Sequence, residues 1–295
     1  MLWSKMISTK PTKPLYHYTT IDGLVGIFSQ EKLWATSIFH LNDKSELTLA
    51  AGMFGEGIDE LAKRTALPPE PAKAPPDYQA DPRRQFLTAL AGVVDIAPEV
   101  PIFVSSFSEA RDQLSQWRGY CSGAYGFCIE FDPAQLEKSS ERQRFLLARC
   151  IYNEDKQKRL ITEYIKQDIE PRLSVINDAN LERNLMESVL QIFLILPILK
   201  HDAFSEEKEW RLIGTLKAAG RRLKFRSGRT TVIPYYEFEL TAEKDSKGTL
   251  PVKSIIVGPT PNEAQALQAV RTLLKQKRMP DQVEVVPSRI PYREI

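Results

Sequence analysis

Hydrophobic and polar positions follow strand and helix periods in separate blocks along the chain. Residues 16–36 begin with the aromatic run YHYT, continue with apolar residues at helical spacing and end in a short apolar run. Thr20 is suited to cap the helix, because a hydroxyl accepts a hydrogen bond from a free amide of the first turn. The pattern therefore predicts a strand, a helix over residues 21–29 and a second strand at 33–36.

Later blocks predict a mixture of strands and helices. Apolar and β-branched runs bounded by turn residues predict strands at 102–106, 126–131, 147–152, 210–214, 235–240, 252–257 and 283–286. Helices are expected after an Asp43 and Glu46 capping box, after Ser108 as far as Gly119, and from about 260 to 277. There are more strands than these helices could cover on both faces of a sheet, so the pattern favours the α+β class.

Two segments differ in character from the rest. Residues 65–84 contain six prolines, which remove amide donors and disfavour helix, so we expect an exposed loop or insertion there. Residues 156–200 form a long helical stretch that is expected to break near Pro171 and around 177–180. In its second half an apolar stripe at Leu181, Leu185, Val189, Ile192 and Leu196 is typical of a core face. We predict one domain over residues 1–295 with a Pro-rich insertion and a helical insertion.

Composition narrows the functional classes. The chain of 295 residues has 40 basic and 38 acidic residues, and a net charge of +2 does not by itself require nucleic acid or anionic lipid as a partner. The longest apolar run, Ile192 to Leu199, is too short to span a membrane, and the start of the sequence lacks a signal-like apolar stretch. These features predict a cytoplasmic protein that does not bind membranes.

Cysteine and histidine do not form a recognisable site. Cys121, Cys128 and Cys150 lack CxxC or zinc spacing, and an odd number argues against a disulfide framework, so we expect three small buried hydrophobic residues. The three histidines are scattered along the chain without a suitable cysteine nearby. The sequence therefore predicts no metal site.

A charged triplet stands at the entry to one predicted strand. In SEEKEWRLIG, residues 205–214, Glu207, Glu209 and Arg211 occupy alternate positions and would share one face, opposite Trp210 and Leu212. Neighbouring carboxylates raise one another's pKa and a guanidinium lowers it. The triplet is therefore either a structural ion-pair ladder or a catalytic group, and both interpretations stay open.

Other candidate residues also have structural explanations. Ser105 and Ser106 end an apolar strand in FVSSFSE, residues 103–109. His17 is either a ligand-binding residue or a hydrogen-bonded histidine of the core or its rim, and Trp117 is either a core residue or part of a pocket. Ser108 and the Asp43 motif are explained most simply as helix caps.

The succession of these motifs resembles a bacterial domain family whose function is unknown, over nearly the whole chain. The resemblance rests on YHYT, LW-x-T, LND-x-x-E, SFSE, W-x-x-Y, FCIEF, E-x-E-W-R, IIVGP and PSRIPYR. The His-Thr strand, the serine-bearing strand and the late Glu-x-Glu strand are also similar to the ADP-ribosyltransferase superfamily, including its DNA-modifying toxin branch. Enzymes with Glu-x-Glu normally carry arginine on the first strand, whereas His17 resembles the histidine branch, so the chain mixes two patterns.

The second resemblance implies a split-sheet core and an enzyme that uses NAD as a substrate. Glu209 would stabilise the charge that develops at the ribose, Glu207 would orient an acceptor, and His17 would bind a ribose hydroxyl. The cofactor-binding residues implied are His17, Tyr18, Thr19, Ser105, Ser106, Trp117, Tyr120 and Arg211, with Tyr18 or Trp117 stacking on nicotinamide. The reaction would be transfer of ADP-ribose to a macromolecule or hydrolysis of NAD, with a toxin-like or phage-defence role.

A different class of function remains open. The chain could be a binding or regulatory module without catalytic activity, in which the Glu-x-Glu strand is structural. Basic residues in segments 220–229 and 271–278 could attract a nucleic-acid or protein acceptor, or could be ordinary solvated surface.

Overall fold

The computed structural model describes residues 2–40, 44–71, 73, 78–92, 102–121, 125–215, 223–228, 230–241 and 250–291. The chain separates into two compact units, each built from segments that are distant in the sequence. The first comprises Met1–Thr9, Ile38–Ile102 and Cys150–Ala203, and the second comprises Lys10–Ser37, Phe103–Arg149 and Phe204–Ile295. This division does not decide whether the chain is one domain, because two compact units can still unfold together in one cooperative step. The single domain over residues 1–295 therefore stays a prediction.

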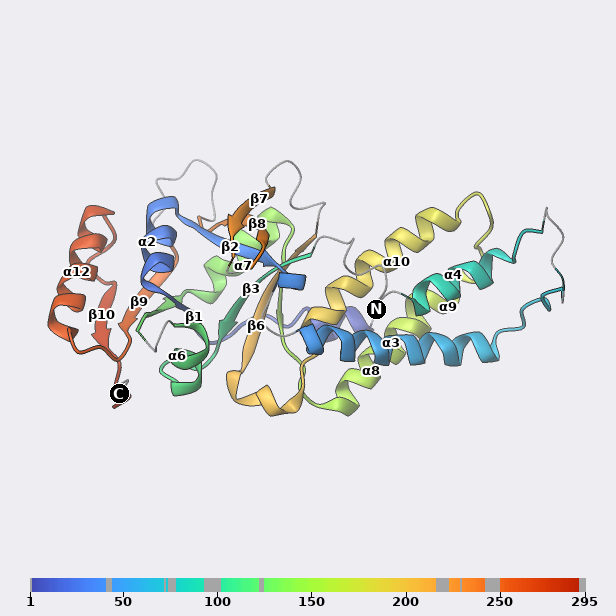
Figure 1. Ribbon diagram of the computed structural model, residues 1–295, viewed down its shortest axis with the longest axis horizontal. Coiled ribbons are helices and arrows are strands. Elements are labelled where there is room, and N and C mark those ends of the chain that lie inside the picture. Colours follow the sequence, from blue (N-terminus) through green and yellow to red (C-terminus); the bar gives the residue numbers. More distant parts are fainter. Residues whose placement is uncertain are drawn as a thin grey trace. The chain divides into compact units, whose positions relative to one another are not determined.

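The first unit is built from helices (Figure 1). They are α1 (Leu2–Ile7), α3 (Lys44–Arg64), α4 (Pro82–Ala91), α8 (Glu154–Tyr164), α9 (Glu170–Arg172) and α10 (Leu181–Ile195), with a π-helical turn at Ile165–Ile169. The indole N–H of Trp3 donates to Asp168 at 2.6 Å, and its ring meets Tyr164 edge-on at 5.1 Å. Helix α1 is therefore anchored to the end of α8 and to the π-helical turn that follows it.

The predictions for this unit were right in part. The helical stretch is confirmed, with an interruption at residues 173–180, and Val189, Ile192 and Leu196 of its apolar stripe are buried. The Pro-rich prediction was wrong for residues 82–84, because α4 begins at Pro82. Asp81 caps that helix by accepting from the Arg83 amide, and proline is well tolerated in a first turn. The side chains of the Asp43 and Glu46 capping box lie outside the described residues.

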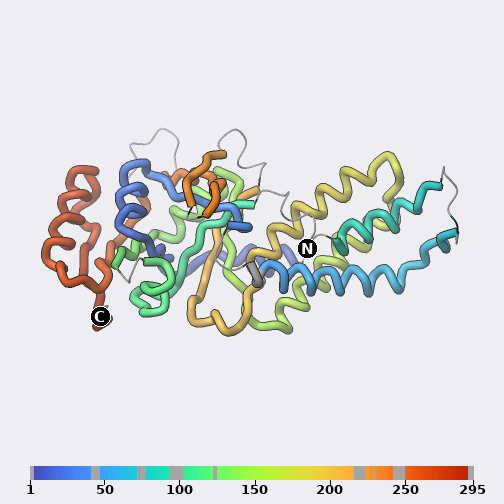
Figure 2. The backbone as a smooth tube through the Cα atoms, in the orientation of Figure 1, coloured from blue at the N-terminus to red at the C-terminus, as the bar shows by residue number. Residues whose placement is uncertain are grey.

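The second unit contains the β-sheet. Its strands are β1 (Leu15–Thr19), β2 (Lys32–Ser37), β3 (Ile102–Ser108), β4 (Phe127–Phe131), β5 (Leu146–Arg149), β6 (Glu209–Thr215), β7 (Leu223–Ser227), β8 (Val232–Glu239), β9 (Val252–Val257) and β10 (Glu284–Pro287). Its helices are α2 (Ile21–Gln30), α6 (Leu114–Tyr120), α7 (Pro133–Gln143) and α12 (Glu263–Gln276). Figure 2 traces β1, α2 and β2 as one continuous blue segment. The α+β class is confirmed.

The sheet branches at β3. The strand order among the described residues is β10-β9-β4-β1-β3-β2-β8-β7, while β6 pairs with both β3 and β5. Three strands therefore border β3, although a strand has two hydrogen-bonding edges. Strand β1 pairs with β3 at Ser108, whereas β2 pairs with it at Phe103 and Val104. Because they meet β3 at different ends, β1 and β2 can share one edge and diverge from each other.

The core face of this sheet packs against the main apolar cluster. Leu15 of β1, Phe107 of β3, and Trp210 and Leu212 of β6 belong to this cluster, together with residues of α2, α7 and α12. In Figure 1, α12 lies beside β9 and β10, whose apolar residues it helps to cover. Burial of these side chains is the main driving force for folding of the unit.

Alternation places a different set of side chains on the second face. Tyr16 and Tyr18 of β1 pack there against Trp117 and Cys121 of α6. Tyr18 meets Trp117 edge-on at 4.8 Å, and its hydroxyl donates to the carbonyl of Ala110. On β6 the same alternation assigns Glu209 and Arg211 to the second face, because Trp210 and Leu212 occupy the core face.

The strand predictions were mostly confirmed, but Ser108 was misassigned. The expected cap residue is the last residue of β3, and α6 begins only at Leu114, after Gln113. The Ser108 hydroxyl instead accepts from the Ala110 amide and donates to the Glu207 carbonyl. Strand β7 was not predicted, since its burial alternates weakly and it borders the sheet.

A substitution at Gly214 of β6 tests the packing of the core face. A Cβ atom at this position would overlap the ring of Phe145, which packs against Tyr236 and Phe238. Gly214→Ala is expected to lower the free energy of unfolding by about 1–3 kcal/mol, measured by chemical denaturation. Gly119→Ala is the control, because nothing lies within 4 Å of its added Cβ. Equal stability of the two variants would contradict the packing described here.

Candidate functional site

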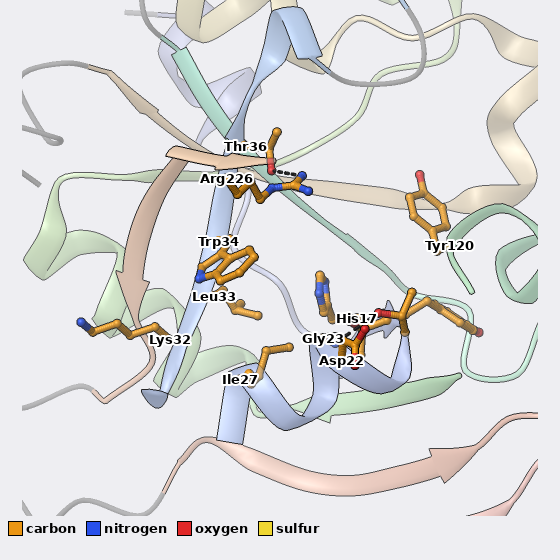
Figure 3. A pocket seen from close by; sticks show the side chains of 14 residues that line it. His17, Asp22, Gly23, Ile27, Lys32, Leu33, Trp34, Thr36, Tyr120 and Arg226 are labelled. Atoms are coloured by element: carbon orange, nitrogen blue, oxygen red, sulfur yellow. Dashed lines mark hydrogen bonds between the residues drawn. The ribbon is translucent and has the colours of Figure 1, made fainter. Parts of the chain in front are cut away.

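A pocket of about 400 Å³ lies in the second unit between β1, α2 and β2 (Figure 3). Strand β1 contributes His17, Tyr18 and Thr19, and the first turns of α2 contribute Gly23 and Gly26. The volume falls within the range of small-molecule sites in proteins. The pocket therefore occupies the place where β1 and β2 diverge.

Aromatic and cationic side chains complete its walls. Trp34 of β2 and Tyr120 of α6 both line the pocket, and each is 41% exposed, which is high for such large aromatic residues. Strand β2 also contributes Thr36, and β7 contributes Arg226. Flat apolar surfaces beside polar groups are suited to a ligand that has both a ring and hydrogen-bonding substituents.

Strand alternation indicates how the pocket is oriented relative to the sheet. His17 shares the core face with Leu15, whereas Trp34 and Thr36 alternate with buried core residues of β2 and belong to the second face. The pocket thus passes between β1 and β2 from His17 towards the second face. This is also the face that carries Glu209.

His17 is positioned by the backbone of β3. Its Nδ1 lies 2.9 Å from the carbonyl oxygen of Ser106, between the two positions where β1 and β2 pair with β3. A carbonyl oxygen only accepts, so Nδ1 carries the proton in the neutral ring and Nε2 is an acceptor. Burial lowers the pKa of His17, which favours the neutral ring despite the opposing effect of the Ser106 carbonyl. The side chain points into the pocket in Figure 3.

Glu209 and Arg211 form a buried ion pair at the start of β6. The Arg211 Nε donates to Oε1 of Glu209 at 2.7 Å, and Nη2 donates to Oε2 at 3.1 Å. Both residues are buried, with Glu209 only 2% exposed. A two-point contact of this kind fixes the position and orientation of the carboxylate. Glu209 lies one strand beyond β3 from His17, so the two residues are close in strand order but do not share the pocket.

Four predicted site residues line the pocket and the others do not. His17, Tyr18, Thr19 and Tyr120 belong to its walls. The described lining does not include Ser105, Ser106, Trp117, Glu207, Glu209 or Arg211. Ser106 takes part only through its carbonyl, which positions His17. The pocket therefore brings together four of the predicted site residues, and a shared role for the others stays a prediction.

The physical reasons for these differences are local. Trp117 is fully buried among Tyr16, Tyr18 and Cys121, and its indole N–H donates to Asp112 at 2.8 Å, so it is a core residue. Ser105 is buried on β3. Glu207 belongs to the 3₁₀ turn Asp202–Glu207 that precedes β6, and its carbonyl accepts from Ser108, so it is not part of the strand alternation that was predicted.

Among the pocket residues that sequence reasoning missed, Trp34, Thr36 and Arg226 have side chains suited to bind a ligand. Trp34 and Thr36 appear in the motif LW-x-T, but no role was assigned to them. The available signal was a tryptophan between the apolar residues Leu33 and Ala35, because strand alternation puts it on the opposite face from them. Arg226 was assigned to a basic surface segment, whereas it lines the pocket. In the same segment the ammonium of Lys224 is bound to Glu237 at 2.7 Å.

The remaining reactive groups have structural surroundings. All three cysteines are buried, as expected, and burial raises the pKa of Cys121 to about 12. Within the described residues no group of histidine, cysteine and carboxylate side chains is arranged to hold a metal ion. No helix in the part of the chain described has both the length and the apolar character needed to cross a bilayer.

Comparison with known proteins gives one family. Residues 116–212, about a third of the chain, match the family described as "Protein of unknown function (DUF2971)". This match supports similarity to a domain family without an assigned activity, from α6 to the start of β6. No curated protein and no solved structure matches the chain.

The burial of His17 predicts a pH dependence of stability. Because its pKa is lowered in the folded state, the unfolded chain takes up a proton first as the pH falls below the usual value of about 6.5. The free energy of unfolding is expected to decrease there by at most about 1.4 kcal/mol per pH unit. Denaturation between pH 7.5 and 5.5 measures this slope, and His17→Gln should make it shallower. A steeper slope in the variant would contradict the assignment.

Proposed function

We propose that the pocket binds NAD and that the chain is an ADP-ribosyltransferase-like enzyme, which transfers ADP-ribose to a macromolecule or hydrolyses NAD. The observation that carries this proposal is the pocket at the branch of the sheet, where neutral His17 is held by the Ser106 carbonyl. The buried Glu209 carboxylate lies on the neighbouring strand β6. The three segments singled out by the sequence thus belong to adjacent strands.

The residues present suit the parts of a dinucleotide. Nε2 of the neutral His17 ring can accept a hydrogen bond from a ribose hydroxyl. Trp34 and Tyr120 offer aromatic surface for a base or the nicotinamide ring. Because the pocket extends towards the second face, a bound dinucleotide would extend towards the face that carries Glu209.

The chemistry explains why a fixed carboxylate is needed. The bond between the anomeric carbon of the ribose and the nicotinamide nitrogen breaks, and its electron pair neutralises the positive charge of the nicotinamide ring. The ribose becomes oxocarbenium-like, and Glu209 would stabilise its positive charge. Water or a nucleophile of the acceptor then forms the new bond to the anomeric carbon and loses a proton. Glu207, immediately before β6, would orient this nucleophile.

The acceptor and the setting follow from the resemblance alone. A protein or nucleic acid is the acceptor in the transferase reaction, and hydrolysis of NAD requires only water. We place the reaction in the cytoplasm and in toxin-like or phage-defence activity.

A non-catalytic binding module is the second candidate. It is favoured by the two hydrogen bonds from Arg211, which occupy both oxygens of the Glu209 carboxylate. In this alternative the ion pair is structural, and the pocket binds a nucleotide without cleaving it. The two candidates differ in whether nicotinamide is released from bound NAD.

Substitution of Glu209 tests the catalytic proposal. Glu209→Gln keeps the shape of the side chain but removes its charge, so nicotinamide release from NAD is expected to fall by about 100-fold to 1000-fold. The release is measured by chromatography after incubation of purified protein with NAD, with and without cell extract as a source of acceptor. Thermal unfolding of the variant checks that the fold survives the loss of the ion pair.

Glu130→Gln is the matched control. Glu130 is a half-buried carboxylate of β4 that accepts from Ser254 and does not line the pocket. Its substitution should leave nicotinamide release unchanged. NAD binding without any release by the wild-type protein would favour the binding module over the enzyme.

Substitution of Gly26 tests whether the pocket is the binding site. Gly26 lines the pocket, and nothing lies within 4 Å of a Cβ atom added there, so a larger side chain can be added at the pocket wall without a clash at its Cβ. Gly26→Leu is expected to weaken NAD binding by at least about 10-fold in calorimetry, while helix stability is maintained because leucine favours helix. Gly52→Leu in α3 is the control, since Gly52 is an equally open helical position outside the pocket. Unchanged binding in Gly26→Leu would remove the pocket from the proposal.

A further inference from the structure

Arg226 is a cation with weak contacts inside the pocket. It extends from β7, and its Nη2 lies 3.5 Å from the hydroxyl of Thr36, at the outer limit of a hydrogen bond. The centre of its guanidinium lies 5.9 Å from the ring centroid of Trp34. Figure 3 shows Arg226 beside Thr36 and close to Trp34, on the side of the pocket away from Asp22 and Gly23.

The Nε atom of Arg226 is covered and has no hydrogen-bond acceptor among the described residues. Arg84, Arg142 and Arg172 share this feature, but each of them pairs with a carboxylate. Arg226 makes no such pair within the described part of the chain. A buried donor without an acceptor is unfavourable, and a ligand that supplies an acceptor removes this cost.

None of the described neighbouring charges compensates the positive charge of Arg226. Lys32, the other cation of the pocket, donates to Glu237 at 2.8 Å, and Lys224 donates to the same carboxylate. Asp22 is exposed at the first turn of α2 and forms no ion pair with Arg226 among the described contacts. Among the described lining residues, the pocket therefore presents a cation at the Thr36 wall that is suited to an anion.

We propose that Arg226 and Thr36 form a phosphate subsite, so that the pocket selects nucleoside diphosphates over nucleosides. This proposal rests on the proposed function in placing the ligand in the same pocket, but it does not require catalysis. A guanidinium binds phosphate oxygens through two parallel N–H donors, which a single ammonium cannot do. The hydroxyl of Thr36, whose contact with Arg226 is long, donates to the same phosphate.

The geometry also explains the position of the aromatic residues. Trp34 and Arg226 lie next to each other, so a phosphate bound at Arg226 brings the rest of the nucleotide between Trp34 and Tyr120. His17 lines the β1 wall of the same pocket and would meet the ribose. The ligand is thus expected to place a phosphate at the Arg226 wall of the pocket and a ribose at the His17 wall.

Calorimetry with ADP and with adenosine tests the subsite. Arg226→Gln is expected to weaken ADP binding by about 10-fold to 100-fold and to leave adenosine binding unchanged. Arg226→Lys keeps the charge without the paired donors and should give an intermediate loss. Lys224→Gln is the matched control, because it removes one positive charge two residues away on β7, and it should bind ADP as the wild type does.

The outcomes separate this proposal from the proposed function. An equal loss of ADP and adenosine affinity in Arg226→Gln, or no ADP binding by the wild-type protein, overturns the subsite. ADP binding that depends on Arg226, without release of nicotinamide from NAD, supports the subsite and counts against the enzyme. If nicotinamide is released from NAD and Arg226→Gln binds ADP as tightly as the wild type does, the enzyme is supported and the subsite is overturned.

Discussion

The hydrogen bond between His17 and the carbonyl of Ser106 marks the point on which the site depends. Strand β3 has three neighbours and two edges, so part of its backbone would lack a partner where β1 and β2 separate. There the His17 side chain of β1 donates a hydrogen bond to the carbonyl of Ser106, at the point where β1 and β2 separate. Because the same imidazole lines the pocket, the geometry of the fold and the chemistry of the site are set by one interaction.

The ion pair of Glu209 and Arg211 is the second feature that needs a reason. Removal of two charges from water is costly, and a buried ion pair is often no more stable than apolar residues of the same size. Its presence next to β3 therefore indicates either a requirement for a charged carboxylate or a requirement for a unique strand arrangement. The same pair underlies both candidate functions, which differ in whether the carboxylate ever exchanges Arg211 for a substrate.

The sequence predicted those parts of the molecule where local pattern determines structure. Thr20 caps α2 as expected, accepting from Gly23, and the alternation of Trp210 and Leu212 correctly assigned the faces of β6. Four pocket residues were found because YHYT lies at the start of a sheet and Tyr120 ends a short helix. The errors arose where contacts between segments that are distant in the sequence determine the structure. Ser108 stays in β3 through its pairing with Tyr16, and Arg226 is brought to the pocket by β7, whose pairing with β8 no local pattern shows.

The division into two units has a consequence for how the protein can be taken apart. The chain passes between them five times, after residues 9, 37, 102, 149 and 203. Neither unit is a continuous stretch of polypeptide, so no single truncation yields the nucleotide pocket without the helices, or the helices without the sheet. During synthesis the first unit is complete only once residue 203 has been made, and the second unit still needs the segment 204–295 that follows.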